Sequence, residues 1–383
     1  MPLSFDLGDF DPGADFEGDS PAGENLRLSD EGRALRSSLR EMREEARRVE
    51  RKADEGNLDD GGWPAARSIW KEVRDQSLDV LKNRSHDLEF ASFLIEALAR
   101  TDGFIGLTLG FELVREMVER QWESVFPVPD PEDGPADDSM IAEEKILPLQ
   151  RLVGLDSEGL LQPALLHIPL TVSRDGEEYG LCHWRSSRDL VGETNEEKLK
   201  LAIERGGTSP KQFEEAVQAT SHSFLKEAFE ELKQAAESWE TLSDAVASAS
   251  NGLAVLPAGQ LRDLFEECVA AYQVFAPSIT VEETTEEAAE EGGEGPGSEA
   301  NGGPTAVGSI RTRADAFAQI EKIAAFFEAN DPHSLIAAHL RTVVRLGRLS
   351  REEYYKKLLQ DPSAVDILFK AVGIEEPEEN GSY

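Results

Sequence analysis

Two residue types that often do chemistry together, a thiol and an imidazole, stand side by side at Cys182 and His183. A cysteine nucleophile needs a base within hydrogen-bond reach. The residues from Tyr179 to Trp184 resemble the second strand of a small hairpin, and neighbouring side chains of a strand point to opposite faces. The pair therefore predicts a structural role, not a nucleophile with its base.

The other candidate groups do not combine into a site. The remaining histidines are scattered, at His86, His167, His222, His333 and His339. An acidic loop suggests calcium, but its glycine falls where an EF-hand ligand should be; the loop contains Asp130, Glu132, Asp133, Gly134, Asp137 and Asp138. Three tryptophans on expected amphipathic helices favour core packing over a ligand pocket: Trp63, Trp70 and Trp122.

Motifs of common enzymes are also missing from the sequence. It has no glycine-rich phosphate loop, no metalloprotease helix motif and no Cys-x-x-Cys pair. We therefore expect no catalytic, cofactor-binding or metal-ligating residue, no cofactor and no enzymatic activity. An enzyme with an unrecognised acidic site, such as a hydrolase, stays an alternative.

Charge is the outlier of the composition, with 39 basic and 76 acidic residues and a net charge of −37. Such a field repels nucleic acid and anionic membranes, so neutral or basic protein surfaces are the expected partners, or the charge only maintains solubility. Cys182 and Cys268 are the two cysteines, which argues against a disulfide framework. Without a visible signal peptide or membrane span, we expect a cytoplasmic protein.

Apolar periodicity predicts a mainly α protein with several helical bundles. An acidic irregular segment, 1–26, precedes a helical domain at 27–155. The first three helices of this domain are expected over 28–52, from Trp63 onward, and after a cap at Ser85. A fourth helix is expected from about 104 to the prolines that follow Phe126, and a fifth over 141–152. The mainly helical middle domain, 156–278, has a possible hairpin formed by 164–172 and 179–184. Its helices are expected over 195–205, from a capping box at Ser209 to Trp239, and after Pro257.

The last hundred residues divide into three parts. Residues 279–308 form an acidic flexible linker, with eight glutamates from Glu282 to Glu299. The apolar stripe that begins at Phe317 predicts a helical domain at 309–374, with expected caps at Ser334 and Ser350. Residues 375–383 form an acidic tail. A core of this size is marginal by itself, which predicts self-association through this domain.

The order of several short motifs resembles the ImpA/TssA family of type VI secretion components. The opening motif is Ser20-Pro21-Ala22-Gly23-Glu24-Asn25-Leu26; the later ones include Trp70, Arg84-Ser85-His86-Asp87-Leu88, the apolar run 93–98, Gly103, Gly106, Trp122, Phe126-Pro127 and the acidic loop 130–134. A weaker likeness covers 179–190. At the C-terminal end, 310–316, Phe326-Phe327 and Asp331-Pro332-His333-Ser334 are similar to the ring-forming region, although Leu335 stands where proline is usual.

The resemblance implies a non-enzymatic assembly protein of the contractile secretion machine, at its baseplate or at the sheath end. It also implies that the C-terminal domain forms a ring of ten or twelve copies, that the N-terminal domains are displayed around it, and that the partners are baseplate, sheath and tube proteins. No nucleic acid and no direct membrane insertion are expected. The alternative from another class is a helical adaptor or scaffold that is unrelated to secretion and self-associates through its C-terminal domain.

Overall fold

A computed structural model describes residues 10–18, 20–130, 134–154, 159–193, 195–280, 320–325, 328 and 336–347. The chain divides into two compact units, Met1–Glu294 and Gly295–Tyr383. The expected caps Ser334 and Ser350, the linker from residue 281 and the acidic tail lie outside the described residues. The expected fold class, mainly α with one small hairpin, is confirmed.

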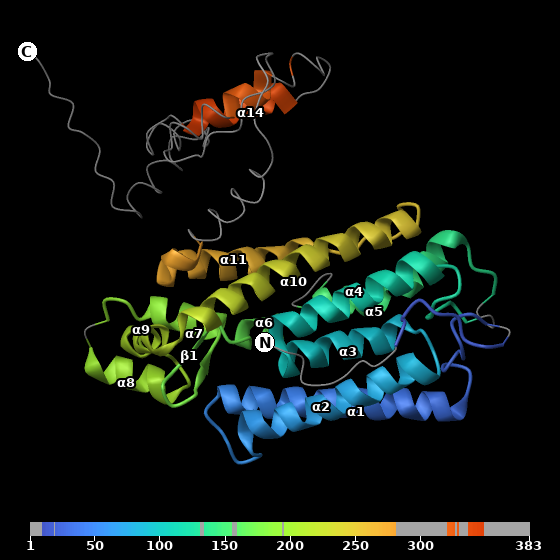
Figure 1. Cartoon of the computed structure of the whole chain (residues 1–383), viewed down its shortest axis with the longest axis horizontal. Coiled ribbons are helices and arrows are strands. Elements are labelled where there is room, and N and C mark those ends of the chain that lie inside the picture. The colour runs from blue at the N-terminus through green and yellow to red at the C-terminus, as the bar shows by residue number, and fades with distance from the viewer. Residues whose placement is uncertain are drawn as a thin grey trace, which may run out of the picture. The chain divides into compact units, whose positions relative to one another are not determined.

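The first unit is built from long helices. Their bounds are α1 Asp30–Asp54, α2 Gly62–Asn83, α3 Leu88–Thr101, α4 Gly103–Gln121, α5 Asp138–Val153, α10 His222–Ala249 and α11 Gly259–Phe275. Shorter elements gather at one end of these helices (Figure 1), namely α6 Gln162–His167, β1 Thr171–Val172, β2 Glu178–Tyr179, α7 Leu181–Asp189, α8 Glu196–Glu204 and α9 Pro210–Ala219. In the second unit, the described residues include α14, Ile336–Gly347.

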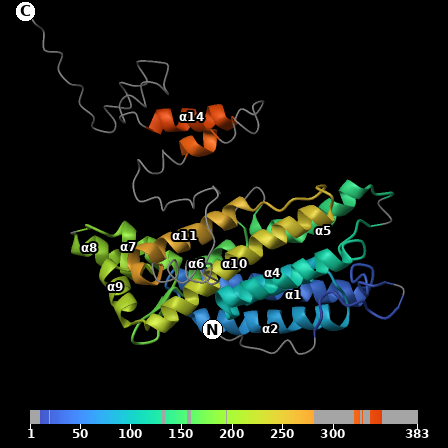
Figure 2. The ribbon, with the colours of Figure 1, turned by 45° about the horizontal axis from the view of Figure 1, so that its top comes forward.

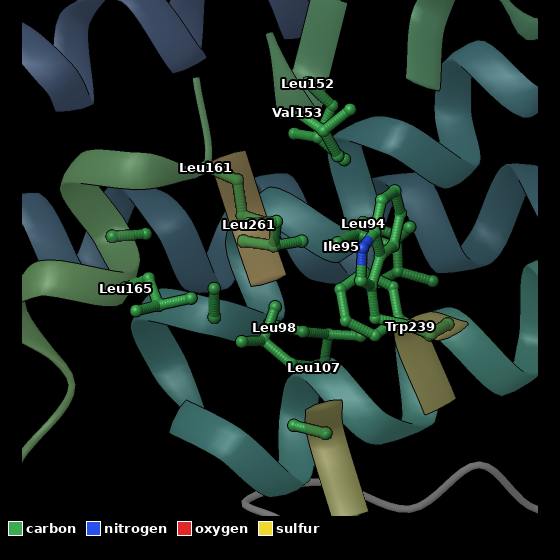
Figure 3. Close-up of a cluster of buried hydrophobic side chains, with 14 of the residues drawn as sticks. Leu94, Ile95, Leu98, Leu107, Leu152, Val153, Leu161, Leu165, Trp239 and Leu261 are labelled. Atoms are coloured by element: carbon green, nitrogen blue, oxygen red, sulfur yellow. The ribbon is translucent and has the colours of Figure 1, made fainter. Parts of the chain in front are cut away.

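One large apolar core runs through most of the first unit, and a small separate cluster is formed by Tyr179, Phe213 and Ala216. Helix α10 packs along α4 (Figure 2), where Trp239 is 1% exposed and its ring centroid lies 5.4 Å from that of Phe111. Figure 3 shows side chains of α3, α4, α5, α6, α10 and α11 converging on this core. The expected division between 155 and 156 therefore crosses a shared core, and separate domains on its two sides stay a prediction.

The predicted start of a helix is correct where no other group forms a hydrogen bond with the predicted capping side chain. Ser209 forms the expected capping box with Gln212. The expected cap at Ser85 is wrong, because its hydroxyl donates to the carbonyl of Glu24 at 2.7 Å, while Asp87 caps α3 by accepting from the amide of Glu89. The fourth helix ends at Gln121, before Trp122, and so ends earlier than the prolines predict.

The expected single helix from Ser209 to Trp239 is two helices. Ala219 ends α9, and Ser221 caps α10 by accepting from the amide of Phe224. Between them, the Thr220 hydroxyl bonds both the amide and the carbonyl of Val172, each at 2.9 Å. Side-chain bonds of this kind offer the backbone an alternative to the helix, which is why the chain bends there.

The hairpin is present but shorter than expected, because each strand has two residues, with Thr171 opposite Tyr179. The expected strand residues 164–167 belong to α6, which has a proline in its first turn and ends before Pro169. Proline suits the first turn of a helix and disfavours helical backbone in the residue before it. The other expected strand, from 181 onward, is helix α7.

Arginines of α1, together with Arg27 just before it, reach two buried carboxylates of α3. Glu89, whose side chain is 6% exposed, pairs with Arg27, Arg36 and Arg40. Glu96, whose side chain is fully buried, pairs with Arg43 and Arg47, whose Nε atoms lie 2.9 and 2.7 Å from its oxygens. Arg100 of α3 reaches Glu50 of α1 at 2.8 Å in return. We call this set of residues the α1–α3 charge ladder.

The ladder controls the ionisation of its carboxylates. Burial by itself raises the pKa of Glu96, but the charges of Arg43 and Arg100 and the hydrogen bond from Arg47 outweigh it and lower the pKa to about 2. The same balance, with Arg36 and Arg40 as the partners, lowers the pKa of Glu89. Both carboxylates are therefore charged at neutral pH, and their removal would leave buried arginines without partners.

Candidate functional site

A cavity of about 1180 Å³ opens where the C-terminal end of α1 and the start of α2 meet α6, the hairpin and α7. Its lining includes Arg51, Asp54, Trp63, Lys71, His167 and His183. They come from four separate parts of the chain. Glycines at 61 and 62, both at positive φ, let the chain turn tightly from the end of α1 into α2 at this edge.

His167, the last residue of α6, is held in the wall by two acceptors. Its Nε2 lies 3.0 Å from Oδ1 of Asp54, and its Nδ1 lies 2.8 Å from the carbonyl oxygen of Pro163. Both oxygens accept hydrogen bonds, so both ring nitrogens carry protons when both bonds form. Burial lowers the pKa of His167, but the bonds with Asp54 and with Cys182 outweigh it and raise the pKa to about 10.

Cys182 and His183 are in contact, which corrects the sequence prediction. They lie in the first turn of α7 and not in a strand, and Sγ of Cys182 is 3.3 Å from Nδ1 of His183. The amide of Gly180 also donates to this Nδ1, at 3.0 Å. Burial raises the pKa of the Cys182 thiol, but the hydrogen bonds with His167 and His183 outweigh it and lower the pKa to about 6. The two side chains therefore can interact, contrary to the expectation for a strand.

The three tryptophans have different environments. Trp70 is fully buried, as expected, and its indole N–H donates to Glu50 at 2.6 Å while Arg100 lies 4.2 Å from its ring. Trp122 is partly buried and packs on the core, with the ammonium of Lys145 5.1 Å from its ring. Trp63 differs, because it is 36% exposed, lines the cavity and lies 4.6 Å from the ring of His167.

The other sequence candidates are not brought into this site. His86 is buried, with its Nδ1 against Oε1 of Gln121 at 2.5 Å. His222 begins α10 and His339 lies in α14, while His333 falls outside the described residues. Asp137 of the acidic loop caps α5. Within the described ranges, no three histidine, cysteine or acidic side chains are arranged to hold a metal ion.

Sequence reasoning missed the contact between Asp54 and His167, which are 113 residues apart in the chain. No pattern in the sequence pairs them, because the packing of α6 on α3, α7 and α11 places its last residue within reach of the end of α1. The charge ladder did have a visible signal. Four arginines follow each other at steps of four, three and four residues along α1, and they are Arg36, Arg40, Arg43 and Arg47.

Three motif segments that are distant in sequence meet at a second place, at the N-terminal end of α3. The amide of His86 donates to the carbonyl of Ala22 at 2.8 Å, and that of Glu24 donates to Arg84 at 2.9 Å. On the other side, the amide of Phe126 donates to the carbonyl of His86 at 3.0 Å. We call these backbone contacts between 20–26, 84–88 and 121–127 the motif junction.

Comparisons with known proteins agree with this arrangement. The model of the family described as ImpA, N-terminal, type VI secretion system, matches residues 14–154, which include the motif junction and the charge ladder. The type VI secretion system component TssA1 of Pseudomonas aeruginosa is 26% identical over 322 residues, which is 83% of this chain and 88% of that protein. The expected resemblance to the ImpA/TssA family is confirmed. The chain is thus similar to type VI secretion components.

A solved structure extends the likeness in fold beyond the family model. It is the N-terminal domain, including the conserved ImpA_N region, of the TssA component from Burkholderia cenocepacia. The TM-score is 0.54 at 22% identity, and the match covers 73% of this chain and 96% of that chain. No helix in the described part of the chain has both the length and the apolar character to cross a bilayer.

Proposed function

We propose that the chain is a non-enzymatic assembly component of a type VI secretion system that acts at the baseplate or at the sheath end. In this proposal, residues 309–374 form a ring of ten or twelve copies. The acidic linker displays the N-terminal units around that ring. It is taken here from residue 281 to 308 and not from 279, because residues 277–280 are helical and Ile279 is 2% exposed in the core. The protein works in the cytoplasm, and its partners are baseplate, sheath and tube proteins.

The observation that carries the proposal is the motif junction. Residues 20–26, 84–88 and 121–127 hold the short motifs that resemble the family, and the structure joins them by backbone hydrogen bonds. They hold the ends of α2, α3 and α4 in place, so the motifs build a scaffold. A component that positions other proteins needs a rigid body of this kind.

Net charge supports the choice of partners. At −37, the chain repels nucleic acid and anionic lipid surfaces and is attracted to basic protein surfaces. Displaying many copies around a ring would add weak contacts together, because a linker raises the effective concentration of the second binding event once the first has formed. Assembly through such contacts requires no catalytic group.

A secretion assay tests the proposal. In a bacterium that encodes this chain, deletion of its gene should abolish release of the tube protein and sheath assembly, and the full chain should restore both. A chain that ends at residue 280 should fold but fail to restore them, because it lacks the ring-forming region. Normal sheath assembly in the deletion strain would contradict the proposal.

Oligomer size distinguishes the proposal from the adaptor alternative. Native mass spectrometry of the full chain should show one large complex of ten or twelve copies, and the chain that ends at residue 280 should not form it. A full chain that stays a monomer or dimer, and that captures no sheath, baseplate or tube protein from its own cells, would favour an adaptor unrelated to secretion.

A further inference from the structure

A buried arginine in the wall of the cavity has a donor without an acceptor. Arg100 belongs to the lining, and its side chain is 5% exposed. Its Nε donates to Glu50 at 2.8 Å, and its Nη1 donates to the carbonyl of Glu96 at 3.2 Å. Its Nη2 is buried and has no hydrogen-bond partner among the described residues. Because a buried donor without an acceptor costs free energy, an acceptor that enters the cavity beside Arg100 would stabilise this wall.

The acidic side chains of the wall are mostly paired within it. Three acid–cation pairs lie in the lining: Glu50 with Arg100, Asp54 with His167, and Glu178 with Arg67. The remaining acid, Glu177, accepts a hydrogen bond from the hydroxyl of Tyr179 at 2.9 Å. One carboxylate of the lining therefore has no cation against it in the described part of the chain.

Two exposed cations of the wall have no acidic partner among the described residues. They are Arg51 of α1 and Lys71 of α2. Each directly follows one member of the pair Glu50 and Trp70, whose hydrogen bond of 2.6 Å joins the two helices. The unpaired charges of the wall are thus more positive than negative, although the whole chain has a net charge of −37. Such a place can recognise carboxylates that the rest of the surface repels.

An apolar face accompanies these cations. Trp63 is 36% exposed and Leu58 is 64% exposed, and both line the cavity. His167, which Asp54 and Pro163 hold in place, supports the ring of Trp63 at 4.6 Å between ring centroids. The volume of about 1180 Å³ exceeds the range of about 300–1000 Å³ that is usual for small-molecule sites. The cavity can therefore take several side chains of a peptide.

We propose that this cavity docks a short segment of a partner protein in which carboxylates flank an aromatic side chain. The carboxylates pair with Arg51 and Lys71, and the aromatic ring packs on Trp63. An acceptor of the same segment satisfies Nη2 of Arg100. This inference rests on the proposed function, since an assembly component has protein partners, and it gives the chemistry of one of them. The cavity is then a local exception on a surface that otherwise favours basic partners.

The first test measures binding of capped tripeptides to the purified full chain by fluorine NMR. The probe is glutamate–fluorophenylalanine–glutamate, and glutamine or lysine replaces both glutamates in the two comparison peptides. At about 0.15 M salt, charges more than about 8 Å away are largely screened, so the acidic surface outside the cavity contributes little. Two exposed ion pairs should make the glutamate peptide bind about fivefold to thirtyfold more tightly than the glutamine peptide. Equal affinities, tighter binding of the lysine peptide, or no binding would overturn the proposal.

The second test locates the preference with variants at exposed positions. Arg51→Gln/Lys71→Gln should lower the affinity for the glutamate peptide to that for the glutamine peptide and leave the latter unchanged. Lys200→Gln/Lys211→Gln is the matched control, because it removes the same charge from exposed cations of α8 and α9 outside the lining. This control should keep the preference. An equal loss in both double variants would show an effect of net charge alone and would overturn the site.

Trp63→Ala tests the aromatic contact. It should weaken binding of the glutamate and glutamine peptides alike, by about twofold to tenfold, because an aromatic pair adds to both complexes. Circular dichroism should show that the variant stays folded, since Trp63 is partly exposed. Unchanged affinity for both peptides in the folded variant would contradict docking against this ring.

The last test separates the partner segment from other occupants. The glutamate tripeptide should bind more tightly than para-fluorophenylacetate, a free aromatic carboxylate that can form fewer ion pairs. A peptide with the sequence of residues 281–290 should displace the probe less effectively than the same tripeptide without fluorine. Tighter binding of the free carboxylate, or of the peptide from this chain, would overturn a partner segment as the occupant. A failure in these measurements leaves the proposed function to its own secretion assay.

Discussion

Two faces of the N-terminal unit are held together by opposite chemistry. Between α1 and α3, long arginine side chains reach Glu89 and Glu96. Between α4 and α10, the contact is apolar, and Trp239 packs near Phe111 with 1% exposure. An ion-pair interface depends on ionisation and on every partner being present, whereas an apolar interface depends on volume. The two faces should therefore fail under different conditions.

The largest effect is expected at the apolar face. Trp239→Ala removes a buried ring, so it should lower the free energy of unfolding by about 3–5 kcal/mol. Urea unfolding should show the same loss at pH 7.5 and at pH 5.5, because neither state of this site ionises. Trp63→Ala is the matched control, and it should cost less because Trp63 is 36% exposed. Equal losses for the two variants would contradict a core role specific to Trp239.

A substitution at the charged face should lower the free energy of unfolding almost as strongly, but only at a pH at which Glu96 is ionised. Glu96→Gln leaves Arg43 and Arg47 without their buried partner and should lower the free energy of unfolding by about 3–4 kcal/mol at pH 7. The pKa of Glu96 is lowered to about 2, so its stabilisation is complete above about pH 4.5 and is lost as the pH falls toward 2. Urea unfolding between pH 7 and pH 3 should show the difference shrinking.

Glu44→Gln is the control for that prediction. Glu44 also pairs with Arg47, at 3.1 Å, but its side chain is 70% exposed. An exposed pair is worth at most about 1 kcal/mol, so this variant should change little at any pH. A loss as large as that of Glu96→Gln would mean that burial does not decide the strength of the ladder.

The buried carboxyl that caps the same helix should behave in the opposite way. Asp87 is fully buried, its Oδ2 has no hydrogen-bond partner among the described residues, and burial raises its pKa to about 6. A raised pKa means that the charged form costs stability, so the cost is absent below about pH 4 and complete above pH 6.

Asp87→Asn should therefore stabilise the protein at pH 7.5 by about 1–3 kcal/mol, because asparagine keeps the cap without the charge. Thermal or urea unfolding should show that the gain disappears by pH 4. Asp137→Asn, at the exposed cap of α5, should give no pH-dependent gain. Destabilisation by Asp87→Asn at pH 7.5 would show that the charged form is needed at this position.

The smallest effect is expected at the exposed edge of the ladder. Arg40 pairs with Glu89, but its side chain is 50% exposed, and Arg27 and Arg36 also pair with that carboxylate. Arg40→Gln should lower the free energy of unfolding by about 0.5 kcal/mol, and added salt should remove the difference. A loss of several kcal/mol would mean that the ladder acts as one unit in which each arginine is needed.

Several features could be predicted because their cause is local in the sequence. Apolar spacing placed the long helices, since one buried face requires a residue every three or four positions. The capping box at Ser209 placed the start of α9, because both bonds lie within four residues. The family motifs are also local, and their order was enough to indicate the ImpA/TssA family. The sequence itself therefore determined the fold class, most helix starts and the resemblance to this family.

The rest depended on contacts between distant segments. The sequence predicts Ser85 as a helix cap, but its hydroxyl donates to the carbonyl of Glu24 instead. The sequence also predicts that Thr220 lies within a helix, but its hydroxyl bonds the backbone of Val172 and the helix ends there. Cys182 and His183 changed from strand to helix, and their chemistry changed with the backbone. The protonated form of His167 is stabilised by its hydrogen bond with Asp54, which is 113 residues away in the chain. Because a pKa is set by what packs around a group, only the tertiary structure decided the ionisation of His167 and Cys182.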